Sequence, residues 1–368
     1  MAELIVLATA FSESMGDSIA LELELLRGVF DHVRVVSPAP FPPVAGVEQI
    51  AAPQKGRAKF FSSPRALTWL TAAGLREVLR LRKAARLRRA IPGGAGVLLA
   101  LGPDAAVAAA MLRDAGDRRA VAVRLWRTDL ENLSPITQRA LGLLDLLFVP
   151  ATEDRDRLAK SAPELANRIE VFPAALEDTS ERCASSSDGV LRILTVGEIP
   201  ASTRIRLLVS ALRKSADPIE WTHLGEGPGL RELSASCSSL QATVQVRFEG
   251  PLSMEKLALH FRERPVDLFF DVGEDERGRT AALRGLARGV PALSVAAAGD
   301  DLVAGSTLPS DIPTAELALR LRTFALAPAG DREARRAAAR AFWEARRGAG
   351  KNLPSLAARL HDLGSGAR

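Results

Sequence analysis

The chain has 368 residues, of which 47% are hydrophobic and 25% are charged, and its formal net charge is +5. This length exceeds one ordinary domain and fits two, and the composition is that of a soluble globular protein. The two cysteines, the four histidines without metal-ligand spacing, and the lack of a bilayer-length apolar run argue against a disulfide framework, a metal cluster and a membrane-spanning protein.

Apolar runs alternate with helix-forming segments through the first half of the chain. The predicted strands are residues 4–8, 32–37, 96–101, 120–125, 144–150 and 169–172. The predicted helices are residues 19–30, 67–91 and 105–115. Because the first strand begins almost at once, we expect no secretory signal peptide.

A stretch rich in Ser, Asp and Glu, residues 177–190, has no periodicity and is typical of a linker. The alternation then restarts, with strands predicted at 191–197, 219–225, 244–250, 266–272 and 291–295, and helices at 204–214, 229–236, 254–264 and 281–288. Continuous apolar strands alternating with helices predict parallel sheets covered on both faces. We therefore expect an α/β protein with Rossmann-like domains at 1–176 and 191–335, and helices at 336–368 that pack back toward the first domain.

The most informative stretch is Trp-Thr-His-Leu-Gly-Glu-Gly-Pro, residues 221–228. A predicted strand ends there in a glycine-rich turn, and a helix follows. Ligands of parallel α/β sheets bind at the carboxyl ends of strands, and the N–H groups that open a helix favour an anion. Glycines at such turns also serve packing alone, so both interpretations remain open at this point.

The densest basic segment lies in the helix predicted at 67–91. Its cationic residues are Arg76, Arg80, Arg82, Lys83, Arg86, Arg88 and Arg89. A nucleic-acid partner is not expected, because the segment has no interleaved aromatic residues and no reader motif. A solvated helix is the first interpretation, and contact with anionic lipid at the inner face of the membrane is the alternative.

The stretch at 221–228, one strand–helix unit into a second Rossmann domain, resembles a branch of glycosyltransferase family 4. Further segments that resemble the family are residues 124–129, 197–208, 267–294, 299–303 and 337–363, together with Glu22, Leu26 and Phe30 of the first helix. The resemblance implies the GT-B architecture, in which two Rossmann-like domains face a central cleft. It also implies a cytoplasmic, retaining transfer of sugar from a nucleotide-sugar to a glycan or lipid-linked acceptor in surface polysaccharide or glycoconjugate biosynthesis, without metal or another cofactor.

The resemblance also assigns site residues position by position. The donor-binding positions are Gly197, Thr203, Arg204, Gly225, Glu226, Gly227, Glu276, Arg277, Gly278, Arg279 and Arg284. The catalytic positions are Glu276, Arg204 and Asp129, and the acceptor-side positions are Arg124, Trp126 and Asp129. In this assignment Glu276 lies near the donor sugar, and Arg204 neutralises the departing diphosphate.

Three of these positions depart from the family. Thr203 stands in a pair that is otherwise basic, Arg284 replaces a carboxylate that contacts the donor ribose, and Trp126 replaces a histidine. A carboxylate accepts hydrogen bonds from hydroxyls, whereas a guanidinium only donates. The departures leave two alternatives open: a catalytically degenerate protein that partners an active transferase, and a binder of nucleotide or glycan without activity.

The same residues have ordinary structural interpretations. Glu276 suits a solvated acidic stretch, and Arg284 suits the surface of a helix. Trp126 suits packing between domains as a buried aromatic residue, and Asp129 suits the N-cap of a helix. The position of His223 inside a strand favours a satisfied core histidine.

Overall fold

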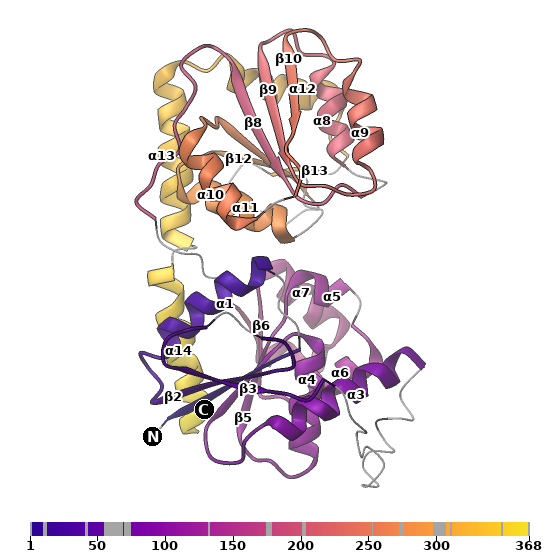
Figure 1. Cartoon of the computed structure of the whole chain (residues 1–368), viewed down its shortest axis with the longest axis vertical. Helices are drawn as coiled ribbons and strands as arrows, with labels where there is room; N and C mark the ends of the chain where they lie inside the picture. Colours follow the sequence, from indigo (N-terminus) through magenta and orange to yellow (C-terminus); the bar gives the residue numbers. More distant parts are fainter. Residues whose placement is uncertain are drawn as a thin grey trace. The chain divides into compact units, whose positions relative to one another are not determined.

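The computed structural model describes residues 2–9, 13–40, 43–54, 69, 75–131, 133–173, 179–200, 204–251, 253–271, 276–296, 307–309, 311–346 and 349–366. The chain forms two compact units, one of Met1–Ala175 with Ala349–Arg368 and the other of Leu176–Gly348 (Figure 1). No helix in the described ranges has both the length and the apolar character needed to cross a membrane.

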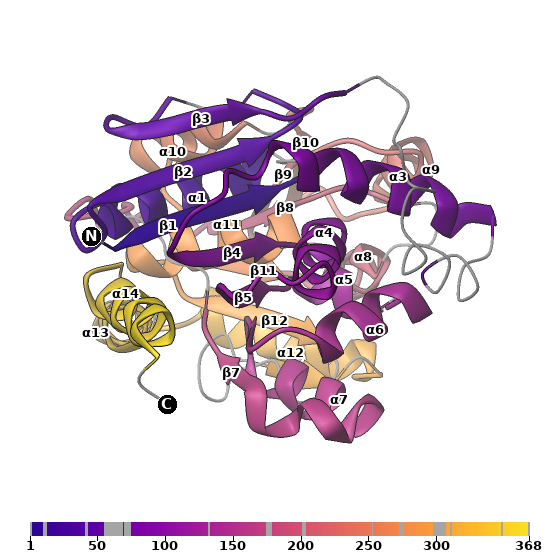
Figure 2. The ribbon, with the colours of Figure 1, turned by 90° about the horizontal axis from the view of Figure 1, so that it is seen from below.

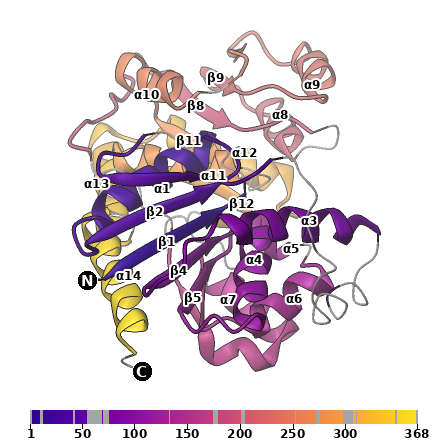
Figure 3. The same cartoon turned by 60° about the horizontal axis from the view of Figure 1, so that its bottom comes forward.

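The first unit is built on a seven-stranded sheet in the order β3-β2-β1-β4-β5-β6-β7, with every described pairing parallel. Its strands are β1 (Glu3–Ala8), β2 (His32–Ser37), β3 (Val47–Ala51), β4 (Val97–Leu101), β5 (Ala120–Arg124), β6 (Leu146–Val149) and β7 (Ile169–Val171). Its helices are α1 (Glu13–Leu26), α3 (Leu75–Ala90), α4 (Pro103–Asp114), α5 (Arg127–Glu131), α6 (Pro135–Gly142), α7 (Thr152–Ser161) and α14 (Ala349–Ser365), with a 3-10 turn at Pro163–Arg168. Helices α3, α4 and α6 pack on one face of the sheet, and α1 and α14 pack on the other (Figures 2 and 3).

The second unit repeats this plan with a six-stranded sheet in the order β10-β9-β8-β11-β12-β13. Its strands are β8 (Leu191–Val196), β9 (Ile219–Leu224), β10 (Val244–Phe248), β11 (Leu268–Asp271), β12 (Ala292–Ala296) and β13 (Thr307–Pro309). Its helices are α8 (Ile205–Leu212), α9 (Leu230–Cys237), α10 (Met254–Glu263), α11 (Glu276–Ala287), α12 (Thr314–Ala325) and α13 (Ala329–Arg346). Helices α8, α9 and α12 cover one face, and α10, α11 and α13 cover the other.

Both sheets reverse their strand order beside the first strand of the unit, between β1 and β4 and between β8 and β11. This is the doubly wound pattern in which ligands bind at the carboxyl ends of the strands, next to the reversal. The expected fold class, two Rossmann-like α/β domains, is therefore confirmed. Strand β3 was not predicted, because it is an edge strand whose residues are mostly exposed, so its sequence lacks a continuous apolar run.

The boundaries of the units differ from those expected. The boundary expected at residue 335 falls inside α13, which is one continuous helix of the second unit. Arg336 explains why, because it is buried there and donates hydrogen bonds to the carbonyls of Val266 and Cys183. Only α14 joins the first unit, where Leu353, Leu356, Ala357 and Leu360 enter its core.

The segment expected to be a linker, residues 177–190, is packed onto the second unit over its described part. The buried carboxylate of Asp267 accepts hydrogen bonds from the backbone N–H and the hydroxyl of Ser186 and from the backbone N–H of Arg192. The backbone N–H of Cys183 donates to the carbonyl of Arg288, at 3.1 Å. A polar composition therefore concealed a segment that is anchored to the second unit at the buried residues Cys183 and Ser186, although most of its other residues are exposed.

Candidate functional site

Two loops lie side by side at the carboxyl edge of the second sheet, one after β8 and one after β9. The backbone N–H of Gly197 donates to the carbonyl of Leu224 at 3.1 Å, and that of Ile199 donates to the carbonyl of Glu226 at 3.0 Å. In return, the N–H of Gly229 donates to the carbonyl of Ile199 at 2.9 Å. The loops therefore form one hydrogen-bonded layer next to the reversal of strand order, where the fold places ligands.

The glycines of this layer are required by its geometry. Gly225 and Gly227 have φ angles of 152° and 155°, which side chains rarely adopt. A Cβ atom on Gly225 would lie 1.9 Å from the carbonyl oxygen of Gly197, and one on Gly227 would lie 2.4 Å from that of Ile199. The packing interpretation of the motif is therefore correct for these glycines. Close packing also keeps side chains away from the loop backbone, at the edge where sheets of this kind bind ligands.

A buried histidine lies directly beneath the two loops. The side chain of His223 is 2% exposed, and its Nδ1 lies 2.8 Å from the hydroxyl of Thr195. The indole N–H of Trp221 donates to that same hydroxyl at 2.8 Å, and the carbonyl of Thr222 lies farther from the hydroxyl, at 3.5 Å, so the shorter contact assigns the hydroxyl proton to Nδ1. The Nε2 atom then carries the imidazole proton, and it has no partner that meets hydrogen-bond geometry within the described residues.

The expectation of a satisfied core histidine is thus met at Nδ1 of His223, whereas Nε2 has the carbonyl of Gly197 nearby but outside hydrogen-bond geometry. Its Nε2 lies next to Gly225, since a Cβ on that glycine would be 2.9 Å away. Burial lowers the pKa of His223 to about 4, and the Gly197 carbonyl opposes this shift only in part. The ring is therefore neutral near pH 7 and presents an N–H donor beneath the glycine loops.

We expect His223 to make the second unit less stable as the pH falls. The pKa of His223 is about 4 in the folded chain, and that of a histidine in an unfolded chain is about 6.5. The unfolded state therefore binds the proton first, and the stability contributed by the neutral ring is lost between about pH 6.5 and pH 4, at up to about 1.4 kcal/mol per pH unit. Urea denaturation across this range measures the slope.

The variant His223→Asn is the control, because it removes the titrating ring and keeps an acceptor for Thr195. Carboxylates and the buried His260 titrate in both proteins, so the difference between the two slopes isolates His223. Equal slopes for the wild type and the variant would show that His223 does not titrate as described.

Helix beginnings surround the loop layer. Arg204 is exposed and immediately precedes α8, and Glu226 is exposed within the second loop. Helix α11 begins at Glu276 and contains Gly278, Arg279 and Arg284. Thr203 and the side chains of Glu276 and Arg277 lie outside the described residues. Glu276 and Arg284 are eight residues apart on this helix, about 12 Å along its axis, so their predicted contacts would fall on different parts of an extended ligand.

Two buried polar residues at this edge were missed in the sequence. Asp271 ends β11 and is 4% exposed, and it accepts a hydrogen bond from the hydroxyl of the buried Ser294 on β12, at 3.1 Å. The sequence did contain a signal for Asp271, because it ends the apolar strand Leu-Phe-Phe-Asp. Burying a carboxyl group there costs free energy unless a hydrogen-bond partner or a ligand compensates it. The hydrogen bond joins the end of β11 to the middle of β12, on the other side of the reversal from His223.

The predicted acceptor-side residues lie at the carboxyl edge of the first sheet. Arg124 ends β5, is buried, and forms an ion pair with the buried Glu22 of α1. Its guanidinium carbon also lies 5.9 Å from the ring centroid of Trp126 and 5.3 Å from that of Phe172. Trp126 is a buried aromatic residue, as the packing interpretation predicts, and the core that it joins is that of the first unit, with α1 and α14.

Asp129 has a capping role, although it is not an N-cap residue. It is the third residue of α5, and its Oδ2 accepts a hydrogen bond from the backbone N–H of Trp126 at 2.9 Å. The backbone N–H of Asp129 donates in turn to the carbonyl of Trp126 at 3.0 Å. The carboxylate therefore reaches back to the start of the helix, as in a capping box. It also lies beside Gly102, which follows β4 with a φ of 82°.

The basic segment forms helix α3, and its charges serve different purposes. Arg80 is held by Asp104 at 2.6 Å and by the hydroxyl of Ser134 at 2.9 Å, and Arg86 donates to the carbonyl of Gln54 at 2.7 Å. Among the residues of α3 whose burial the structure describes, the exposed cations are Arg82, Lys83 and Arg89. The solvated interpretation therefore applies to part of the helix, while other arginines tie it to its neighbours.

No family model matches the sequence, and no curated protein matches it. Solved structures match over nearly the whole chain. The apo form of the lipopolysaccharide outer core galactosyltransferase WaaB is 11% identical, with a TM-score of 0.69 and coverage of 99% of this chain and 100% of that one. HepE of Anabaena in complex with UDP and glucose is 15% identical, with a TM-score of 0.67 and coverage of 98% and 99%.

A third match is described as trehalose-6-phosphate from E. coli bound with UDP-2-fluoro glucose. It is 13% identical, with a TM-score of 0.72 and coverage of 98% of this chain and 99% of that one. At such identities the likeness establishes the fold, which is the two-domain GT-B fold. The similarity to these solved structures therefore confirms the expected fold class independently of the strand order.

Proposed function

We propose that the protein is a glycosyltransferase that takes a sugar from a nucleotide-sugar and transfers it, with retention, to a glycan or lipid-linked acceptor. Surface polysaccharide or glycoconjugate biosynthesis is the proposed setting, in the cytoplasm or at the inner face of the membrane. One observation carries the proposal: the hydrogen-bonded glycine loops after β8 and β9, with the Nε2 of His223 beneath them, lie at the reversal of strand order. The Anabaena and E. coli structures that share the fold hold UDP with glucose and UDP-2-fluoro glucose.

The proposed chemistry is electrostatic. As the bond between the sugar and the diphosphate breaks, negative charge develops on the departing diphosphate. Backbone N–H groups at helix beginnings and the Arg204 guanidinium stabilise that charge. We assign Glu276, the first residue of α11, to the donor sugar, and Asp129, in α5, to the acceptor side. Donor binding further involves Gly197, Thr203, Gly225, Glu226, Gly227, Arg277, Gly278, Arg279 and Arg284.

In this proposal Arg124 and Trp126, the residues predicted on the acceptor side, act indirectly. Both are buried, so they support the loop that carries Asp129 rather than meeting an acceptor at their present positions. A nucleotide-sugar and an acceptor are the expected ligands, with no metal or further cofactor. The exposed cations of α3 are the proposed contact with anionic lipid.

A second candidate function is a degenerate transferase that binds a donor and regulates an active partner enzyme. The observation that favours it is Arg284 in α11, where the family resemblance implies a carboxylate toward the ribose. Turnover separates the two functions, because a transferase releases UDP from UDP-sugar in the presence of acceptor. A regulatory protein binds the nucleotide-sugar without releasing UDP.

We expect Arg204→Glu to weaken UDP binding, because it replaces a donor for the diphosphate with a repelling carboxylate. A charge-assisted hydrogen bond contributes about 1.5–3 kcal/mol, so the dissociation constant should rise at least about tenfold. Isothermal titration with UDP and with GDP measures it. Arg322→Glu is the matched control, because Arg322 is exposed in the last turn of α12, away from the carboxyl edge of the sheet. If the two variants bind UDP equally well, Arg204 is not part of a donor site.

A further inference from the structure

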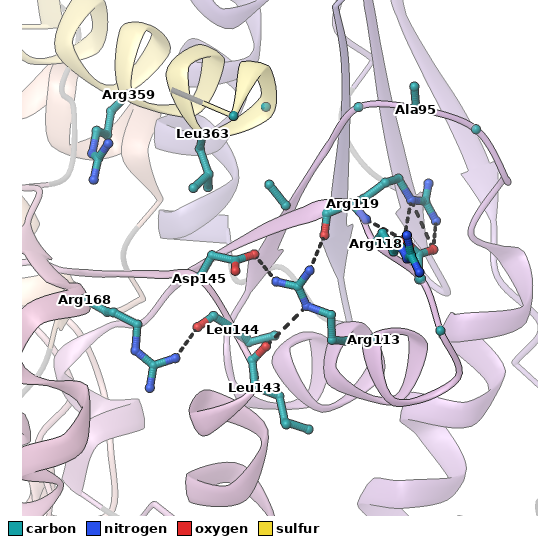
Figure 4. Close-up of a pocket in the computed structure, with 17 residues that line it drawn as sticks. Ala95, Arg113, Arg118, Arg119, Leu143, Leu144, Asp145, Arg168, Arg359 and Leu363 are labelled. Atoms are coloured by element: carbon teal, nitrogen blue, oxygen red, sulfur yellow. Dashed lines mark hydrogen bonds and ion pairs between the residues drawn. The ribbon is translucent and has the colours of Figure 1, made fainter. Parts of the chain in front are cut away.

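A large hollow in the first unit lies away from every residue assigned above. Its volume is about 1080 Å³. It is lined by five arginines, Arg113, Arg118, Arg119, Arg168 and Arg359, with Asp117 and Asp145 as the acidic lining residues. We call this hollow the arginine groove. Figure 4 shows Arg168 and Arg359 on one side, Arg118 and Arg119 on the other, and Arg113 with Asp145 between them.

The arginine groove lies at the amino edge of the sheet. The lining segments 94–96, 116–119 and 143–145 immediately precede or begin strands β4, β5 and β6, and the last turns of α14 complete the wall. Trp126 and Asp129 follow the carboxyl end of β5, so the groove is at the opposite end of the strands. It is therefore a separate place from the proposed acceptor side and belongs to one unit alone.

The charges in the groove do not cancel. Arg113 forms an ion pair with Asp145. Arg119 donates hydrogen bonds to the Asp117 carboxylate from Nε and Nη2, at 3.0 and 2.6 Å. The hydrogen bonds from Arg119 lower the pKa of the Asp117 carboxyl, so that pair stays ionised near neutral pH. Arg359 is paired outside the lining with Glu170, at 2.7 Å. Each of these three cations therefore has its own carboxylate.

Two arginines are left without such a partner. Arg168 donates through Nη1 to the carbonyls of Leu144 and Gly142, at 2.6 and 3.2 Å, which satisfies one nitrogen and leaves its charge in place. Arg118 is exposed and makes no hydrogen bond or ion pair with the described residues. They lie on opposite sides of the groove, so an occupant between them would meet positive charge from both directions.

The remaining lining suits a ligand with an apolar body. Glycines at 94, 96, 116, 364 and 366 bring no side chains into the groove, and Leu143 and Leu363 give it apolar surface. Guanidinium groups present forked donors that match phosphate oxygens. The volume is of the size that holds a small-molecule ligand.

We propose that the arginine groove is a second binding site, for a phosphate-bearing ligand held mainly by Arg118 and Arg168. The phosphate belongs either to a soluble phosphate ester or to a lipid headgroup. This site is independent of the proposed donor site, because it uses the other unit and the other edge of its sheet.

The test is isothermal titration of the full chain with inorganic pyrophosphate. Arg118→Glu should weaken binding at least about tenfold, because it removes a charge-assisted donor and adds a repelling charge. Arg157→Glu makes the same charge change at an exposed position of α7 outside the groove and should bind as the wild type does. Since Arg118 is exposed, its variant should fold normally, which circular dichroism verifies.

The donor site could also take pyrophosphate, so Arg204→Glu separates the two sites. Pyrophosphate binding that survives Arg204→Glu and fails in Arg118→Glu supports the arginine groove, whether or not the protein binds UDP. A second arm sediments the chain with vesicles of phosphatidylglycerol in phosphatidylcholine. Vesicle binding that Arg118→Glu abolishes, without pyrophosphate binding, supports the site and identifies its ligand as a lipid headgroup. The proposal is overturned if Arg118→Glu and Arg157→Glu behave alike in both arms, or if the wild type binds neither probe.

Discussion

Gly225→Ala should abolish nucleotide binding and lower the free energy of unfolding of the second unit by about 2–6 kcal/mol, the sum of backbone strain and overpacking. The new Cβ would lie 1.9 Å from the carbonyl oxygen of Gly197, at a φ of 152°. Neither loop can move easily to relieve this clash, because backbone hydrogen bonds connect the two loops. Urea denaturation followed by tryptophan fluorescence measures the loss, since Trp221 is buried beside the loops.

Gly330→Ala is the matched control for this prediction. Gly330 lies in α13 of the same unit, and a Cβ there would meet no atom within 4 Å. Alanine in an open helical position should leave stability unchanged or raise it by up to about 1 kcal/mol. If Gly225→Ala is as stable as Gly330→Ala and binds UDP as the wild type does, the loop layer is not as tight as described.

Arg124→Ala should destabilise the first unit by about 3–5 kcal/mol, because it leaves a charge buried without its partner. That charge belongs to the Glu22 carboxylate of α1, which is 3% exposed and forms an ion pair with Arg124 at the end of β5. Thermal or urea unfolding measures the effect. Glu48→Ala is the control, since it breaks an exposed ion pair with Arg34 and should cost less than about 1 kcal/mol.

The double variant Glu22→Leu with Arg124→Leu tests the stated cause. It removes both charges and replaces them with apolar volume, so it should recover most of the stability that Arg124→Ala loses. If the double variant is less stable than Arg124→Ala, or if Arg124→Ala costs no more than Glu48→Ala, buried charge is not what makes this residue important. Arg124 would then be better explained as a residue that meets a ligand.

The elements that were predictable are those whose own residues carry the pattern. Buried parallel strands such as β1 and β4 read as continuous apolar runs, because both faces of the sheet are covered. The exposed edge strand β3 has no such run and was missed. Likewise, the polar segment at 177–190 gave no sign of the hydrogen bonds from Ser186 to Asp267, because its partner is 81 residues away.

The positions of site residues in the fold could be predicted from the sequence, but the residues that they contact could not. The glycine motif correctly located the edge of the sheet, yet the reason for Gly225 lies in the carbonyl of Gly197, which the motif does not contain. His223 was expected to be satisfied; the hydroxyl of Thr195 meets Nδ1, whereas Nε2 has only the carbonyl of Gly197 nearby, outside hydrogen-bond geometry. Such facts depend on which loops meet, and a local sequence pattern does not record that.

The central claim is that a nucleotide-sugar binds at the carboxyl edge of the second sheet. A crystal structure of the full chain grown with UDP tests it most directly. We predict electron density for the diphosphate against the backbone of the loops after β8 and β9, within reach of Arg204 and the beginning of α11. Density for UDP only in the arginine groove, or none at the loops when UDP binds in solution, would contradict the claim.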